Sequence, residues 1–202
     1  MTTITCYVDP VCPYAWATSS WLRQVRAEHP DIEVGWRQLS LAALNTGREP
    51  AGTSSARITD SRLLGRVVAA THGPDETIET FYEAIGNRIH REALPLSSEV
   101  IAAALAEAGL DPALADLADD DSLDPLVAER HQQSQRALGE PGGSPITVIN
   151  NTAYFGPVLT AIPDRDESER LLQVMLGAAA VPALAELHRP RSGPPLLTES
   201  DD

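Results

Sequence analysis

The stretch Val8-Asp9-Pro10-Val11-Cys12-Pro13-Tyr14-Ala15-Trp16 decides how this chain folds. The β-rich segment before it, residues 2–8, predicts a buried strand. Behind it, apolar residues recur at helical spacing, and Pro13 suits the first turn of a helix, where its missing N–H is not needed. Cys12 therefore falls at a strand-to-helix junction, beside free N–H groups that favour an anion. We expect an exposed thiol with a lowered pKa there, although a small buried cysteine at a turn would fit the same residues.

The length and composition suit one globular domain, or one domain that carries a large insertion. The chain has 202 residues, of which 43% are apolar, enough for a proper core. Its formal net charge of −14 argues against binding to nucleic acid or to an anionic membrane, since both need clustered positive charge. No apolar run reaches membrane-spanning length, and the N-terminus has no basic or hydrophobic signal segment. We therefore expect a cytoplasmic protein.

The chain has two cysteines, Cys6 and Cys12. If Cys6 lies in the first strand, an extended segment of roughly 20 Å separates the two residues, which is beyond the reach of a disulfide bond. We expect two free thiols, with Cys6 in the core as a small hydrophobe. No spacing of Cys and His residues is typical of a metal site, so we expect none.

The order of elements predicts an α/β fold interrupted by helices. A helix over 13–28 and a second strand over 32–39 complete a parallel βαβ unit with the first strand. Residues 57–138 read as almost wholly helical, with N-caps expected at Ser97 or Ser98, Asp111 and Asp124. A hairpin over 146–149 and 152–155 and a final helix over 167–180 follow. We predict a thioredoxin-like domain from 1–56 and 139–188, an inserted helical subdomain over 57–138, and a flexible tail over 189–202.

Five segments in this order resemble the DsbA family of thioredoxin-fold proteins, and in particular its actinobacterial mycothiol-dependent nitroreductase group. They are Asp9-Pro10-Val11-Cys12-Pro13, residues 39–45 (LSLAALN), 86–90 (GNRIH), 143–146 (GSPI) and 154–159 (YFGPVL). The resemblance implies a DsbA-like thioredoxin fold with a large all-helical insertion. Because pockets tend to form where two subdomains meet, we predict that residues 57–138 form a lid over Cys12, with a substrate cleft between the insert and the sheet. The resemblance also implies that Pro145, after Ser144, is a cis-proline facing Cys12; a Gly-rich turn into a strand can hold such a bond.

Ala15 departs from the pattern of this family. Its oxidoreductases carry a second cysteine three positions after the first, and that thiol releases the substrate from the mixed disulfide. Alanine cannot do this, so the two-cysteine redox cycle is absent.

Two enzymatic functions remain, beside a binding module without chemistry. The favoured hypothesis makes Cys12 a lone covalent nucleophile that isomerises a conjugated polyene or enoyl substrate, free or carrier-tethered, by reversible thiolate addition and without a cofactor. The alternative is a monothiol oxidoreductase in which external mycothiol resolves the adduct. A homodimer is compatible with either function.

The supporting residues come from the matched segments. His90 is the candidate general acid or base, although a lone His on a helix is more often structural. Candidate substrate contacts are Pro13, Tyr14, Asn45, Asn87, Arg88, Ser144 and Pro145. Five arginines of the insert could receive an anionic group, or could simply be solvated: Arg57, Arg62, Arg66, Arg88 and Arg91. Trp16, Trp21 and Trp36 read as core residues.

Overall fold

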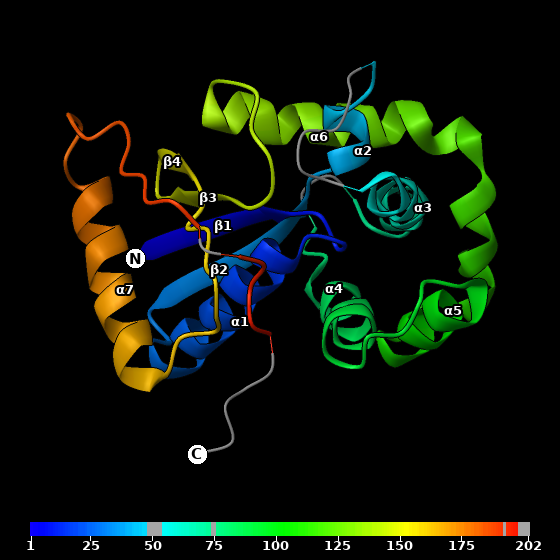
Figure 1. The fold of residues 1–202 in the computed structure, drawn as a ribbon, viewed down its shortest axis with the longest axis horizontal. Coiled ribbons are helices and arrows are strands. Elements are labelled where there is room, and N and C mark those ends of the chain that lie inside the picture. Colours follow the sequence, from blue (N-terminus) through cyan, green and yellow to red (C-terminus); the bar gives the residue numbers. More distant parts are fainter. Residues whose placement is uncertain (48–53, 74–75, 192, 198–202) are drawn as a thin grey trace.

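A four-stranded mixed sheet forms the centre of the protein, with strand order β2-β1-β3-β4 (Figure 1). The structure is a computed structural model and describes residues 1–47, 54–73, 76–191 and 193–197. The strands are β1 (Thr2–Val8), β2 (Ile32–Gln38), β3 (Ile146–Ile149) and β4 (Thr152–Phe155). β1 pairs with β2 in parallel and with β3 antiparallel, and β3 pairs antiparallel with β4. The predicted βαβ unit and the hairpin are both present.

The helix α1 (Pro13–Glu28) joins β1 to β2 and starts as the sequence predicts. Pro13 occupies its first turn, with Cys12 as the N-cap residue. Ile4, Cys6 and Val8 on alternate positions of β1 are buried, which is the period expected of a strand with a covered face. The carboxyl end of β1 points toward the helices that follow β2 (Figure 1). Cys12 therefore lies where the sheet meets these helices.

The block between β2 and β3 is helical, as predicted. It contains α2 (Leu41–Leu44), α3 (Ser55–Thr71), α4 (Glu79–Gly86), the π-helical turn η1 (Asn87–Arg91), α5 (Ser98–Glu107), the 3₁₀ helices η2 (Pro112–Asp119) and η3 (Asp121–Leu123), and α6 (Asp124–Leu138). The Gly/Pro/Ser-rich connection before α3 includes residues 48–53, which lie outside the described part of the chain. α7 (Arg165–Ala179) closes the fold at the other end of the sheet (Figure 1).

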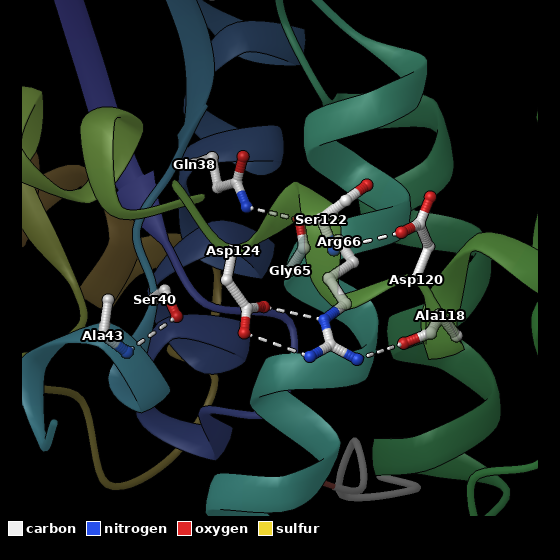
Figure 2. A network of polar contacts seen from close by, with 9 residues as sticks. All are labelled: Gln38, Ser40, Ala43, Gly65, Arg66, Ala118, Asp120, Ser122 and Asp124. Atoms are coloured by element: carbon white, nitrogen blue, oxygen red, sulfur yellow. Dashed lines mark hydrogen bonds and ion pairs between the residues drawn. The ribbon is translucent and has the colours of Figure 1, made fainter. Parts of the chain in front are cut away.

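A buried arginine, Arg66 of α3, fixes the helices of this block to one another (Figure 2). Its Nε and one terminal nitrogen donate to the two carboxylate oxygens of Asp124 at 2.7 and 3.1 Å, and the other nitrogen donates to the Ala118 carbonyl at 3.0 Å. Such a forked pair is stronger than a single contact because both N–H groups are aligned. The predicted N-cap role of Asp124 is wrong: the residue begins α6, Leu123 is the N-cap, and the carboxylate binds Arg66 instead. The predicted caps at Ser97 and Asp111 are confirmed.

Sheet and insert share one hydrophobic core. Its buried members include Ile4 and Trp36 from the sheet, Leu64 from α3, Phe81 from α4 and Ile101 from α5. Burial of apolar surface on this scale is the main stabilising term in folding. The helical insert is therefore continuous with the sheet, and its description as a separate subdomain stays a prediction.

The chain after α7 contacts the sheet side of the molecule in its described part. The Leu196 N–H donates to the Thr160 carbonyl at 2.9 Å, and the Tyr14 hydroxyl donates to the Gly193 carbonyl at 3.2 Å. The predicted flexible tail over 189–202 includes residues 192 and 198–202, which lie outside the described residues. Among the helices that the structure describes, none is both long and apolar enough to cross a membrane.

Candidate active site

The Cys12 thiol lies between the start of α1 and the loop before β3. Its Sγ donates a hydrogen bond to the Ser144 carbonyl at 3.2 Å, and its N–H donates to the Asp9 carbonyl at 3.0 Å. Only 5% of the residue is exposed. The thiol is therefore held at the predicted helix terminus, but the prediction that it is exposed is wrong.

The expected acidification of Cys12 is also wrong, because burial outweighs the helix terminus. Desolvation raises the pKa of the Cys12 thiol above its ordinary value, and the nearby Asp9 carboxylate raises it further. The backbone N–H groups of Ala15 and Tyr14 and the contact with Ser144 act in the opposite direction and lower the pKa. In this closed arrangement Cys12 is a thiol at neutral pH.

Ser144 and Pro145 face Cys12, and the peptide bond between them is cis, as the sequence analysis expects. The Ser144 hydroxyl accepts a hydrogen bond from the Asp9 N–H at 2.9 Å while its carbonyl accepts from the Cys12 thiol. The hydroxyl and the carbonyl of Ser144 therefore both bind residues 9–12 between β1 and α1, the segment called the cysteine loop from here on. If a substrate displaced the Cys12 thiol proton from this contact, the Ser144 carbonyl could accept a hydrogen bond from the substrate beside the sulfur.

The sequence analysis did not identify Asp9 as a site residue. Asp9 is 1% exposed, and its carboxylate accepts three hydrogen bonds: from the Val11 N–H at 3.0 Å, the Leu41 N–H at 2.6 Å and the Ser61 hydroxyl at 2.5 Å. These donors belong to the cysteine loop, α2 and α3. Burial still raises the pKa of the Asp9 carboxyl despite the three donors. No local pattern marks this role, because two of the donors come from distant segments.

His90 lies on the π-helical turn and contacts the cysteine loop. Its Nε2 is 2.8 Å from the Pro10 carbonyl, which can only accept, so Nε2 carries the proton. The imidazole stacks on the Trp16 indole with ring centres 5.6 Å apart. Burial lowers the pKa of His90 to about 4, so the ring is neutral at pH 7. π-helical turns are frequent at functional sites, and this one places His90 against the cysteine loop.

The other predicted contacts divide into two groups. Pro13 and Tyr14 adjoin Cys12 in the chain, and the Arg191 guanidinium lies 4.8 Å from the centre of the Tyr14 ring. The Asn45 side-chain amide donates to the Leu41 carbonyl, so it binds the end of its own helix, α2. Asn87 begins the π-helical turn, and its carbonyl accepts from the Glu92 N–H.

Two of the five insert arginines, Arg66 and Arg88, are occupied by contacts within the protein. Arg88 donates to the Ala84 carbonyl and pairs with Glu107, each at 2.8 Å, while Arg66 pairs with Asp124. These contacts hold helices together and leave little of either guanidinium for a substrate. Arg57 differs, because its charge acts on His90 and helps to lower the pKa of that imidazole.

Within the described part of the chain only 5% of Cys12 is exposed, so the substrate cleft expected beside it is not seen there. The insert does lie on the Cys12 side of the sheet, as the contacts of His90 and Ser61 show. A shallow recess elsewhere, lined by Arg37, Arg130 and Gln133 among others, does not include Cys12. We therefore expect that a substrate can reach the sulfur only after residues around it move.

Neither of the two positions that could supply a second thiol does so. Ala15 is fully buried in the first turn of α1, and Cys6 is fully buried in β1. Burial raises the pKa of Cys6 to about 12, and its sulfur contacts Thr147 Oγ1 at 3.8 Å. Both cysteines are free, and Cys6 is the inert core residue that the sequence predicts. The described residues contain no group of three or more metal-binding side chains.

This geometry defines a class: a DsbA-like thioredoxin-fold protein with a single cysteine at the helix N-terminus, opposite a cis-proline. A sequence profile for "Mycothiol-dependent nitroreductase Rv2466c" matches residues 11–189. The chain therefore belongs to the Rv2466c-like family of mycothiol-dependent nitroreductases. It is 31% identical over 197 residues to the "Uncharacterized protein Rv2286c" of Mycobacterium tuberculosis (strain ATCC 25618 / H37Rv), which covers 95% of this chain and 84% of that protein.

Solved structures support the fold. A 2-hydroxychromene-2-carboxylate isomerase aligns with a TM-score of 0.59 at 12% identity, covering 87% of this chain and 93% of that one. The "probable DsbA oxidoreductase SCO1869" of Streptomyces coelicolor aligns with a TM-score of 0.56 at 15% identity, covering 95% of each chain. At these identities the likeness establishes the thioredoxin-like fold with its helical insert.

Proposed function

We propose that this protein is a mycothiol-linked enzyme in which Cys12 is the lone covalent nucleophile. One observation carries the proposal: Cys12 faces Ser144 and the cis-proline at the start of α1, while Ala15 fills the position of a resolving thiol. Family membership supports mycothiol as the second thiol. Family membership is therefore the reason to rank a mycothiol-dependent reaction above isomerisation, which the sequence alone favours.

The proposed cycle needs one thiol from the protein. The Cys12 thiolate attacks a mixed disulfide between mycothiol and a second thiol compound, a new S–S bond forms on Cys12, and the second compound leaves as a thiol after taking a proton. A further mycothiol then takes the mycothiol sulfur from Cys12, and the Cys12 thiolate returns. The net reaction converts the mixed disulfide and one free mycothiol into mycothiol disulfide and the free thiol of the second compound, so mycothiol is a consumed substrate. Two free thiols and this chemistry favour a cytoplasmic location.

The residues present suit a small thiol at the nucleophile, but only in an opened site. The sulfur of Cys12 is the group with which a thiol must exchange, and the Ser144 carbonyl lies 3.2 Å from it. The His90 contact with Pro10 is one of those that close the insert onto this loop. The proposed reaction does not depend on the homodimer that we also propose.

Restoring the missing cysteine tests the proposal. Ala15→Cys should create a dithiol pair and raise turnover with mycothiol mixed disulfides, while the size-matched Ala15→Ser should not. After incubation with mycothiol disulfide, the intact mass should show one adduct. Peptide mapping should place that adduct on the peptide that contains Cys12. An adduct absent from wild type, or one that survives Cys12→Ser, contradicts the proposal.

Isomerisation of a conjugated small-molecule or carrier-tethered substrate is the second candidate. The surroundings of Cys12 favour it: Trp16, Tyr82 and Val11 are buried nearby and would suit a flat apolar substrate better than a polar one. Reversible addition converts a C=C bond into a single bond that can rotate before elimination. Here Ala15→Cys should leave the rate unchanged or lower it, because the new thiol could pair with Cys12. The two geometric isomers, separated by chromatography, give the readout.

A further inference from the structure

Arg130 of α6 carries a buried positive charge without an ion pair. Only 6% of the residue is exposed. One terminal nitrogen donates to the Val68 carbonyl at 3.3 Å and to Gln38 Oε1 at 3.5 Å, and the other donates to the His72 carbonyl. Among the residues that the structure describes, Nε has no hydrogen-bond partner and no carboxylate forms an ion pair with the guanidinium. Buried cations are normally paired with an anion, so the charge of Arg130 is incompletely compensated.

The carboxyl end of α3 supplies part of the compensation. Val68 lies in the last turn of α3 and His72 follows that helix, where backbone carbonyls present the negative end of the helix dipole. A helix end is equivalent to about half an elementary charge, which is less than the charge of a guanidinium. Burial lowers the pKa of Arg130, and the charges of Glu129 and Glu76 raise that pKa without an ion pair to either. An excess of positive charge therefore remains.

Arg130 lines the shallow recess together with a second arginine. Arg37 of β2 and Gln133 of α6 belong to the same lining, and both residues are half-buried. Within the described ranges, neither of these two side chains has a hydrogen bond or an ion pair to another residue. The guanidinium of Arg37 and the amide of Gln133 therefore keep their N–H donors unused. Charged and neutral N–H donors around one recess are the groups that bind an oxyanion.

The lining also contains one carboxylate, that of Glu76. One of its oxygens accepts the Gly73 N–H at 2.6 Å, so the backbone already holds this group. In the part of the chain that the structure describes, it forms no ion pair with either arginine of the recess. Two arginines and one carboxylate leave the lining with a formal charge of +1. The recess therefore attracts an anion even with Glu76 ionised.

The recess lies at the carboxyl edge of the parallel strands. Gln38, which also lines it, is the last residue of β2 and pairs in register with Val8, the last residue of β1. The Gln38 amide donates to the Gly65 carbonyl of α3 at 2.8 Å (Figure 2). In open α/β sheets, ligands bind outside the carboxyl ends of the parallel strands. The recess has such a position, one strand away from the strand that leads to Cys12.

We propose that this recess binds a small molecule through an oxyanion, the carboxylate or phosphate group of a metabolite, next to Arg37 and Arg130. The Arg37 guanidinium and the Gln133 amide donate hydrogen bonds to the oxygens of the ligand, and its negative charge completes the compensation of Arg130. The site is separate from Cys12, and the inference does not depend on the reaction of that thiol. Binding can therefore be measured on the whole protein without a substrate of that reaction.

An NMR titration of the wild-type protein with acetate, and separately with inorganic phosphate, tests the inference. Potassium chloride at the same ionic strength is the reference, because salt alone screens charges. At least one of the two oxyanions should bind with a dissociation constant of about 1–10 mM and shift the side-chain amide signals of Gln133. The anion that binds more tightly identifies the ligand group as carboxylate or phosphate. If neither titration saturates, or if chloride produces the same shifts, the inference is overturned.

Two variants of the lining should change the affinity in opposite directions. Arg37→Gln should weaken anion binding about tenfold, because it removes a charged donor that the fold does not use. Glu76→Gln should tighten the binding about threefold, because it removes the negative charge from the lining and keeps an acceptor for the Gly73 N–H. Arg37 is the better arginine to change, since Arg130 also holds the end of α3. Weaker binding in Glu76→Gln contradicts the inference.

Arg136→Gln is the matched control for Arg37→Gln. Arg136 lies on α6, is exposed and does not belong to the lining of the recess. Its replacement changes the net charge of the protein by the same amount, so it should alter the dissociation constant less than about twofold. If Arg37→Gln has no larger effect than this control, the anion responds to overall charge alone, and the inference is wrong.

Discussion

Two opposing influences act on the pKa of the Cys12 thiol. The N–H groups of the first turn of α1 favour its thiolate, while burial and the Asp9 carboxylate favour its thiol, and burial is the largest of these. We expect the balance to reverse when a substrate separates the insert from the cysteine loop, because water and the helix terminus then act together. A nucleophile that stays protonated until its substrate arrives is protected from unwanted oxidation.

Removing the charge of Asp9 should make Cys12 more acidic. In Asp9→Asn the repulsion between carboxylate and thiolate disappears, so alkylation of Cys12 should begin at lower pH than in wild type. The variant should also lose about 1–3 kcal/mol of stability, since one backbone donor loses its acceptor. The rate of iodoacetamide labelling against pH gives the first result, and urea unfolding gives the second.

Ser40→Ala is the control for this change. Its hydroxyl is buried and accepts from the Ala43 N–H at the start of α2 (Figure 2). Loss of this cap should cost about 1 kcal/mol and leave the labelling profile of Cys12 in place. A profile that moves equally in both variants would mean that Asp9 acts through the fold alone.

Cys6 should make the protein sensitive to alkali. Its pKa is raised to about 12 in the folded state, and about 8.5 is ordinary for a free thiol. Between these values the unfolded chain has lost the proton and the folded chain has kept it, so stability falls as pH rises, by about 1.4 kcal/mol per unit. Urea midpoints from pH 8 to 11 should fall less steeply in Cys6→Ala than in wild type. Parallel curves would contradict the assignment.

Among the elements, α4 and the turn η1 determine how closely the insert approaches α1. Gly86 ends α4 against the face of the Trp16 indole, and η1 then carries His90 to the Pro10 carbonyl. The extra residue of a π-helical turn rotates the positions that follow it, which aims His90 back at the cysteine loop. Closure of the site thus depends on a short segment, Gly86–His90.

Gly86→Ala should separate α4 from α1. An added Cβ would lie 2.2 and 2.4 Å from two carbons of the Trp16 ring, so one of the elements must shift, at a cost of about 1–3 kcal/mol. Cys12 should become easier to label as a result. Gly177→Ala in α7 has open space around its Cβ and should instead stabilise the protein by about 0.5–1 kcal/mol. Equal stability of the two variants, measured by urea unfolding, would contradict this packing.

The sequence predicts the elements well because their signals are local. Alternation in residues 2–8, Pro13 at a first helical turn and the caps at Ser97 and Asp111 all depend on neighbours within a few positions. The state of Cys12 does not, because its burial comes from Ser144 and from the helices of the insert. The contacts of Asp9 were missed for the same reason. Asp124 shows the limit most clearly: a sound local signal for a cap was overruled by Arg66.

At the scale of the whole molecule, the insert and the sheet should unfold together. One core contains residues from β1, β2, α3, α4 and α5, and Asp9 joins α2 and α3 to the cysteine loop. We therefore expect one cooperative transition in urea, with coincident curves from tryptophan fluorescence and far-UV circular dichroism. Two separate transitions would show that the inserted helical subdomain predicted over 57–138 unfolds independently of the sheet.

The contact between Tyr14 and the chain after α7 has a practical consequence for anyone who builds fusions of this protein. Gly193 and Arg191 contact the Tyr14 ring, two positions from Cys12, so a reporter or affinity tag joined at the carboxyl end would be attached to a segment that contacts the first turn of α1. Met1 is 94% exposed and precedes β1, at the end of that strand opposite Cys12 (Figure 1). Tags, fluorophores and surface tethers for the experiments above belong at the amino end.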